Sequence, residues 1–134
     1  MGAFYMFEIL LAVSAVTVTT PPSIRVINLD TRDCSMMVKI ANDMQAELPK
    51  MVDRVTRLDG FVVLCSLRTV SNAKFIDADL AQMRSGWRER KQRQWSEINC
   101  KNEAFLRMIK RGWRFVQFFT LRSGERYSMD AICK

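Results

Sequence analysis

The stretch WRFVQFFTLRSGERYSMDAIC, residues 113–133, decides the fold class of this sequence. Apolar and aromatic side chains recur at every second position over 113–121, except at Gln117, and a second alternating run follows over 127–133. A period of two is typical of β-strands. Between the two runs, Ser123 and Gly124 are residue types that favour a tight turn. The stretch therefore predicts a β-hairpin.

Two helices are expected before this hairpin. The first covers about 76–98, with a weak position at Gly86 that costs up to about 1 kcal/mol relative to alanine. A shorter helix is expected over 102–110, with Gly112 as the signal that ends it. The apolar face of the first helix consists of side chains at three- and four-residue spacing, namely Ile76, Leu80, Met83, Trp87, Trp95 and Ile98.

The preceding part of the sequence predicts one helix and one strand. The helix starts near Thr31, with Asp30 or Thr31 as its N-cap, and ends before Pro49. The strand covers 61–70, which is rich in Val and Leu. The predicted fold is α+β in the order α-β-α-α-β-β: a short antiparallel sheet of about three strands, with helices packed on one face.

The N-terminal region indicates a targeting segment. Its apolar run covers 3–18, and the cleanest part, 9–18, is shorter than the roughly 20 residues that span a bilayer. This is typical of a signal peptide, although Met1–Glu8 contains no Lys or Arg. The alternative is a buried N-terminal strand or helix. The expected organisation is a signal-like segment over 1–20, a linker over 21–30 and a single α+β domain over 31–134.

Four cysteines form an even, dispersed set: Cys34, Cys65, Cys100 and Cys133. None of them shows the two-residue spacing of a zinc or thioredoxin-like motif, so we expect no metal site. In an exported protein such a set forms disulfides, whereas four free thiols would indicate a cytosolic core. Three pairings are possible. The expected topology ranks Cys100–Cys133 first, because it ties a helix to the final strand, and Cys34–Cys65 second.

The stretch LPKMVDRVTRLD, 48–59, resembles a motif of small, uncharacterised exported bacterial proteins. These continue with a strand, a helix that runs into a cysteine, and a hairpin that ends near a second cysteine. The resemblance covers about 35–133. It implies export and a Cys100–Cys133 bridge, and it implies no known activity. The additional pair Cys34 and Cys65 and the strongly basic helix are departures from the pattern.

Charged residues of this motif form one candidate cluster, Asp53, Arg57 and Asp59. Asp53 and Arg57 are four residues apart, which is the spacing of a helical salt bridge. The cluster could surround a ligand, but a capping and turn-forming role is favoured. The sequence contains no histidine, which removes the commonest general base and metal ligand. We therefore expect no catalytic residue and no cofactor; a small enzyme based on Asp53 and Asp59 is the weakest hypothesis.

A net charge of +7 favours anionic partners. Tryptophans interleaved with arginines over 84–95 could stack on bases or dock on an anionic membrane surface. The favoured interpretation places Trp87 and Trp95 in the core and leaves a solvated basic face. The candidate anion or partner surface comprises Arg88, Arg90, Lys91, Arg93, Lys110, Arg111 and Arg114.

These observations predict a periplasmic or secreted, non-catalytic interaction module. Its expected partner is another protein or an envelope assembly, while an anionic membrane surface and nucleic acid are lesser options. The alternative is a cytoplasmic nucleic-acid-binding domain that uses the basic helix over 84–95.

Overall fold

The computed structural model describes residues 21–134, with side chains from Asp30 onward. The chain divides into two units, 1–33 and 34–134, which are described separately. The signal-like segment over 1–20 lies outside the described residues. Helix α2 spans Pro21–Gln45, so it begins before the expected Thr31 and includes the stretch 21–30 that we expected to be a linker. Prolines are compatible with this start, because amides of the first turn have no intrahelical partner.

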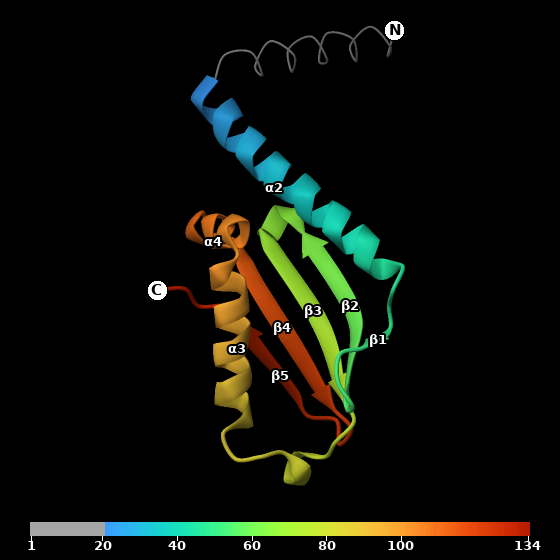
Figure 1. Cartoon of the computed structure of the whole chain (residues 1–134). Helices are drawn as coiled ribbons and strands as arrows, with labels where there is room; N and C mark the ends of the chain where they lie inside the picture. The colour runs from blue at the N-terminus through green and yellow to red at the C-terminus, as the bar shows by residue number, and fades with distance from the viewer. Residues whose placement is uncertain (1–20) are drawn as a thin grey trace, which may run out of the picture. The chain divides into compact units, whose positions relative to one another are not determined.

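The second unit contains a five-stranded mixed sheet (Figure 1). Its spatial order is β1-β2-β3-β4-β5, with β3 and β4 parallel and every other neighbouring pair antiparallel. The expectation of about three antiparallel strands is therefore wrong, although the α+β class agrees with the structure. The strands are β1 (Lys50–Met51), β2 (Thr56–Leu64), β3 (Thr69–Ile76), β4 (Arg114–Leu121) and β5 (Arg126–Asp130).

A sharp turn explains the miscounted strands. The single strand expected over 61–70 is divided by a short 3-10 helix, Cys65–Leu67, after which Arg68 adopts a left-handed conformation with φ of 45°. The chain reverses there, so β2 and β3 form an antiparallel hairpin. A non-glycine residue with positive φ gives no strong sequence signal, because sterics disfavour it and tertiary contacts must maintain it.

The long helix expected over 76–98 is shorter in the structure. Ile76 ends β3, Leu80 lies in a 3-10 helix, and α3 spans Trp87–Lys101. Gly86 is the N-cap of α3 rather than an interior weak position, and its φ of 74° suits a residue without a Cβ atom. Helix α4, Glu103–Lys110, agrees with the expected short helix. Together α3 and α4 form the crossover that a parallel β3–β4 pair requires.

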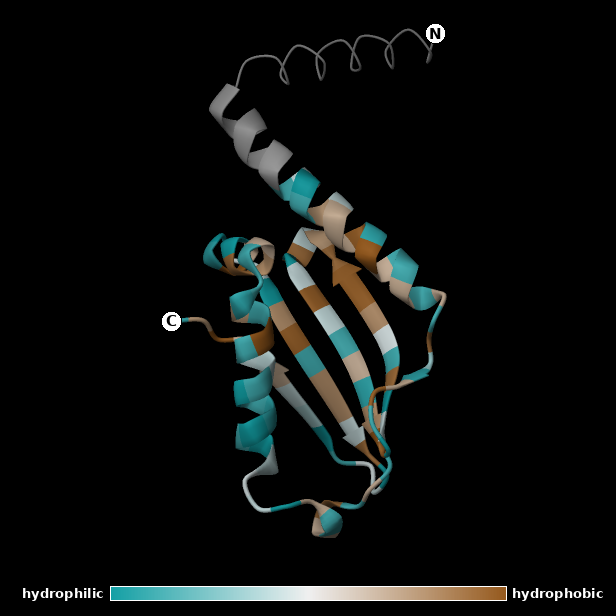
Figure 2. Ribbon diagram, in the orientation of Figure 1, coloured by the Kyte–Doolittle hydropathy of each residue, from teal (hydrophilic) through white to brown (hydrophobic). Residues whose placement is uncertain are grey.

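Within the second unit, α3, α4 and the part of α2 from residue 34 onward pack on one face of the sheet. From α2, Met37 contacts a core cluster with Met108 of α4 and Phe115 of β4. A second cluster joins Trp87 of α3 to Phe119 of β4 and to other buried side chains. Figure 2 shows α3 as mostly hydrophilic beside strands with many hydrophobic positions, so α3 contributes few but large apolar side chains to the core.

Two disulfides fasten the helices to the sheet. Cys34 of α2 is bonded to Cys65 in the turn after β2, and Cys100 of α3 is bonded to Cys133. Both Cα–Cα distances are 5.6 Å. Cys100–Cys133 is the pair that the sequence ranked first and Cys34–Cys65 the pair that it ranked second, although Cys133 lies beyond β5 rather than at its end.

Candidate functional site: a groove along α3

Three connected hollows line the side of α3 that faces β3 and α2. We number them from the apolar end near Phe105 to the polar end near Arg84. The first and second hollows share Trp95 and Ile98 as lining residues, and the second and third share Lys91 and Gln94. Shared lining residues make the hollows one continuous feature, which we call the α3 groove. Its lining includes Met37, Ile40, Met44, Asn72, Ile98 and Phe105 at one end, Lys74, Lys91, Gln94 and Gln117 in the middle, and Val55, Asp77, Arg84, Trp87 and Arg90 at the other end.

The apolar end is a hollow of about 210 Å³ between α2, α3, α4 and the sheet. Ile98 stands at its rim with 65% of its surface exposed. The side-chain oxygen Oδ1 of Asn72 is buried and has no hydrogen-bond partner among the described residues. A buried acceptor without a donor is unfavourable, but a donor that enters the hollow would reach this oxygen only if the surrounding side chains moved.

The middle of the groove contains two lysines from different elements. Lys74 belongs to β3, and its Nζ donates a hydrogen bond of 2.8 Å to Gln117 Oε1. The same Nζ lies 5.9 Å from the ring centroids of Trp95 and of Phe119. Burial, and next the positive charge of Lys91, lower the pKa of Lys74. This part of the groove therefore presents positive charge in a half-buried setting.

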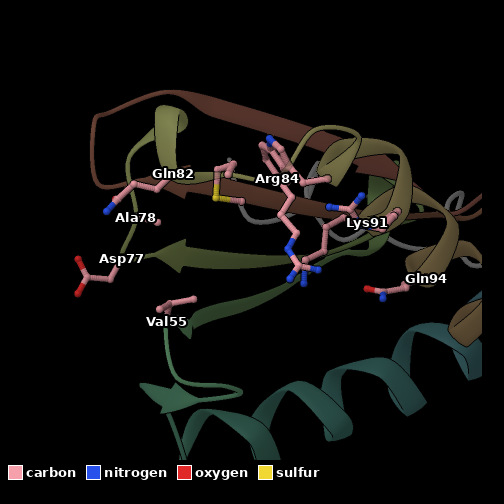
Figure 3. A pocket seen from close by; sticks show the side chains of 10 residues that line it. Val55, Asp77, Ala78, Gln82, Arg84, Lys91 and Gln94 are labelled. Atoms are coloured by element: carbon pink, nitrogen blue, oxygen red, sulfur yellow. The ribbon is translucent and has the colours of Figure 1, made fainter.

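The third hollow is wider, at about 500 Å³, and more polar. Figure 3 shows Val55 and Asp77 on one side of it, with Arg84, Lys91 and Gln94 opposite. Asp77 already forms an ion pair with Arg122 at 3.2 Å. The basic side chains on the opposite wall therefore dominate the charge of this end.

The motif residues Asp53, Arg57 and Asp59 do not converge on a ligand site. Asp53 Oδ1 accepts hydrogen bonds from the amides of Val55 (2.9 Å) and Thr56 (2.8 Å) and so organises the loop between β1 and β2. Burial opposes ionisation of Asp53, but the hydrogen bonds from Val55 and Thr56 outweigh it, so its pKa lies below the ordinary value.

Arg57 and Asp59 form an ion pair with each other on β2, and the Arg57 guanidinium lies 5.0 Å from the centroid of the Phe75 ring. The helical salt-bridge spacing of Asp53 and Arg57 is irrelevant, because this segment is a hairpin. Of the three, Asp53 organises a turn, whereas Arg57 and Asp59 pair with each other along a strand.

The seven candidate basic residues are distributed over several surfaces. Arg90 and Lys91 line the α3 groove, whereas Arg88 lies 4.5 Å from the centroid of the Tyr127 ring on the opposite flank of α3. Arg114 forms a two-point ion pair with Asp130, at 2.8 and 3.0 Å. The remaining three are Arg93, exposed on α3, and Lys110 and Arg111, at the end of α4.

Sequence reasoning missed Lys74, Asn72 and Gln117. In β3 the signal is an alternation: Val70, Asn72, Lys74 and Ile76 occupy every second position and turn toward the core. Two of these four inward positions are polar. That alternation is visible only once 69–76 is recognised as a strand. The described residues hold no group of three or more metal-ligating side chains.

Within residues 21–134, no helix combines the length and apolar character needed to cross a bilayer. The two disulfides favour an oxidising compartment outside the cytoplasm. They do not support the cytoplasmic alternative.

Comparisons with known proteins support the fold. No protein-family model matches the sequence, and no curated protein matches it either. A candidate secreted protein of Pseudomonas aeruginosa has a similar structure, with a TM-score of 0.59 and 19% identity over 75% of this chain and 89% of its own. A pilotin of the type 2 secretion system of Vibrio vulnificus has a TM-score of 0.54 and 13% identity, over 75% and 86% respectively. At these identities the similarity concerns the fold alone.

Proposed function

We propose that this protein is an exported, non-catalytic binding module that holds a segment of another protein in the α3 groove. One observation carries the proposal. The apolar hollow beside Ile98 is open at the surface, and it continues along α3 into the hollow that contains Lys74 and Lys91. A concave apolar site with few polar groups is the usual form of a binding pocket.

The dimensions of the groove suit a short peptide segment. Helix α3 rises by about 16 Å between Trp87, at one end of the groove, and Ile98, at the other. About five extended residues or about eleven helical residues span this distance. A segment of this length would combine an apolar contact in the first hollow with polar contacts in the third.

Export and a protein partner have independent support. The disulfides favour an extracytoplasmic compartment. The structural neighbours are a candidate secreted protein and a pilotin of a secretion system. They support a partner that belongs to an envelope assembly. A nucleic-acid function has weaker support, because a strand of phosphates would need the basic side chains on one surface, and Arg88 and Arg114 lie elsewhere.

Photo-crosslinking in the native host tests the proposal. Benzoylphenylalanine replaces Ile98 at the groove rim in one variant and Arg93, an exposed residue of the same helix, in a matched control. We expect a discrete crosslinked protein with the probe at Ile98 and none with the probe at Arg93. Equal crosslinking at both positions, or none at Ile98, would contradict a role of the α3 groove in binding.

A further inference from the structure

Two ammonium groups in the middle of the α3 groove have no carboxylate in direct contact. Among the described residues, neither Lys74 nor Lys91 takes part in an ion pair. Asp53 is the acidic residue whose field reaches both lysines. Its carboxylate stays ionised and is held in the β1–β2 loop by the amides of Val55 and Thr56, so one distant negative charge offsets two positive ones only in part.

The surroundings of Lys74 make this charge arrangement costly for the protein alone. Its ammonium group lies below α3, between aromatic rings, with Gln117 as its hydrogen-bond acceptor. Burial of a cation without an anion is unfavourable, and a second cation close by adds repulsion. A carboxylate supplied from outside would relieve both effects, because it would neutralise the pair and accept hydrogen bonds from both lysines.

We propose that the partner segment carries an Asp or Glu side chain that binds between Lys74 and Lys91, next to large apolar side chains that enter the hollow beside Ile98. This inference rests on the proposed function and names the chemistry of the partner. The apolar hollow and the lysine pair share Trp95 and Ile98 as lining residues, so neighbouring side chains of one segment can reach both.

The course of the groove favours an acidic side chain within a segment over a C-terminal carboxylate. Beyond Lys91 the groove continues into the hollow of about 500 Å³ that contains Arg84 and Arg90. A chain that ended at the lysine pair would leave this hollow empty, whereas an internal segment continues through it.

Selection from a random-peptide phage library tests the inference. The oxidised full-length protein is the bait, and peptides are retained only if the uncharged Ile98→Asn variant fails to bind them. This filter restricts the collection to ligands of the α3 groove. We expect the retained peptides to share an Asp or Glu next to Leu, Ile, Phe or Met.

Charge exchange then locates the acidic side chain. Lys91→Glu should weaken a retained peptide by about tenfold or more, the size expected for a half-buried charge pair. Replacement of the peptide's acidic residue by Lys should restore its binding to the Lys91→Glu variant. Arg93→Glu changes the protein's net charge equally on the exposed side of α3, so it should alter the affinity by less than about twofold.

The outcomes separate the two proposals. Retained peptides without acidic enrichment, or equal effects of Lys91→Glu and Arg93→Glu, would overturn the carboxylate inference and leave the binding function intact. If no peptide depends on Ile98, the proposed function itself fails. Circular dichroism of each variant verifies that it is folded, and Lys91→Gln serves in place of Lys91→Glu if the charge reversal prevents folding.

Discussion

The two walls of the α3 groove differ in how they are attached to the sheet. Helix α3 is fixed along its whole length: Trp87 packs edge-on against Phe119, Trp95 Nε1 donates to the Phe115 carbonyl at 2.9 Å, and Cys100 forms a disulfide. The side chains of Gln92 and Ser96 bond to the backbone at and after the end of β5 as well.

The α2 wall has fewer attachments. Over 34–45 it is held by the Cys34–Cys65 disulfide, by the buried Met37 and Ala41, and by a 3.0 Å hydrogen bond from Gln45 Nε2 to a backbone carbonyl. Local stability follows the density of such contacts. Helix α3 therefore provides a fixed wall, and we expect α2 to be the wall that adjusts to a bound segment.

The largest expected effect concerns the fixed wall. Trp87→Ala should lower the free energy of unfolding by about 3–5 kcal/mol, because it removes a buried aromatic side chain and leaves a cavity beneath α3. Ile98→Ala, in the same helix but exposed, should cost less than about 1 kcal/mol. Urea denaturation measures both. Equal losses would mean that α3 does not depend on its tryptophan anchor.

The disulfides test whether the walls are independent. Their loops span 31 and 33 residues, so Cys34→Ser with Cys65→Ser and Cys100→Ser with Cys133→Ser should each cost about 3.7 kcal/mol. Hydrogen exchange should distinguish the two variants. The first should accelerate exchange over 34–45 and spare α3, whereas the second should leave α3 well protected, because its other contacts remain. Equal acceleration of α2 in both variants would contradict the comparison.

A smaller effect is expected at the C-terminal end of α2. Gln45→Ala removes the hydrogen bond to the Phe61 carbonyl and should cost about 1 kcal/mol or less. Its signature is faster exchange in the last turn of α2. Asn42→Ala, at an exposed position of the same helix, is the matched control and should leave exchange unchanged. No difference between the two variants would show that this contact does not hold α2.

The smallest effect, and the most diagnostic for the groove, concerns Lys74. Burial and Lys91 place its pKa below the unfolded value, so the unfolded state binds more protons in the window between these two pKa values. The stability of the wild type should therefore rise with pH across that window, relative to Lys74→Met. Urea titrations at neutral pH and at pH values approaching about 10.4 measure the difference. A constant difference across this range would contradict the burial of a charged Lys74.

Much of the fold could be predicted because its signals are local. Helix α4 has Asn102 as its cap, with Oδ1 accepting from the Phe105 amide at 3.1 Å, and Gly112 follows it with a φ of 99°. The hairpin of β4 and β5 follows from alternation and a Ser-Gly turn. The strand β3 was missed, because inward polar residues obscure its alternation and Arg68 conceals the preceding turn.

The candidate site was harder to predict than the fold. Arg90 and Lys91 were identified from the charge of their helix, and both line the α3 groove. Lys74, on which the groove chemistry depends, lies in a strand that sequence reasoning assigned to a loop and a helix. A charge pair formed by side chains from two distant elements leaves no local pattern.

By itself, the sequence determined the α+β class, the C-terminal hairpin, the helix α4 and the ranked cysteine pairs, because these depend on neighbouring residues and on where the cysteines fall among the elements. Only the tertiary structure decided that β3 lies parallel to β4 and that Lys74 faces Lys91 beneath α3. The physical reason is that both features arise from packing between segments far apart in the chain. Such contacts form because they bury apolar surface and place charges favourably in the whole domain. No short stretch of sequence therefore predicts them.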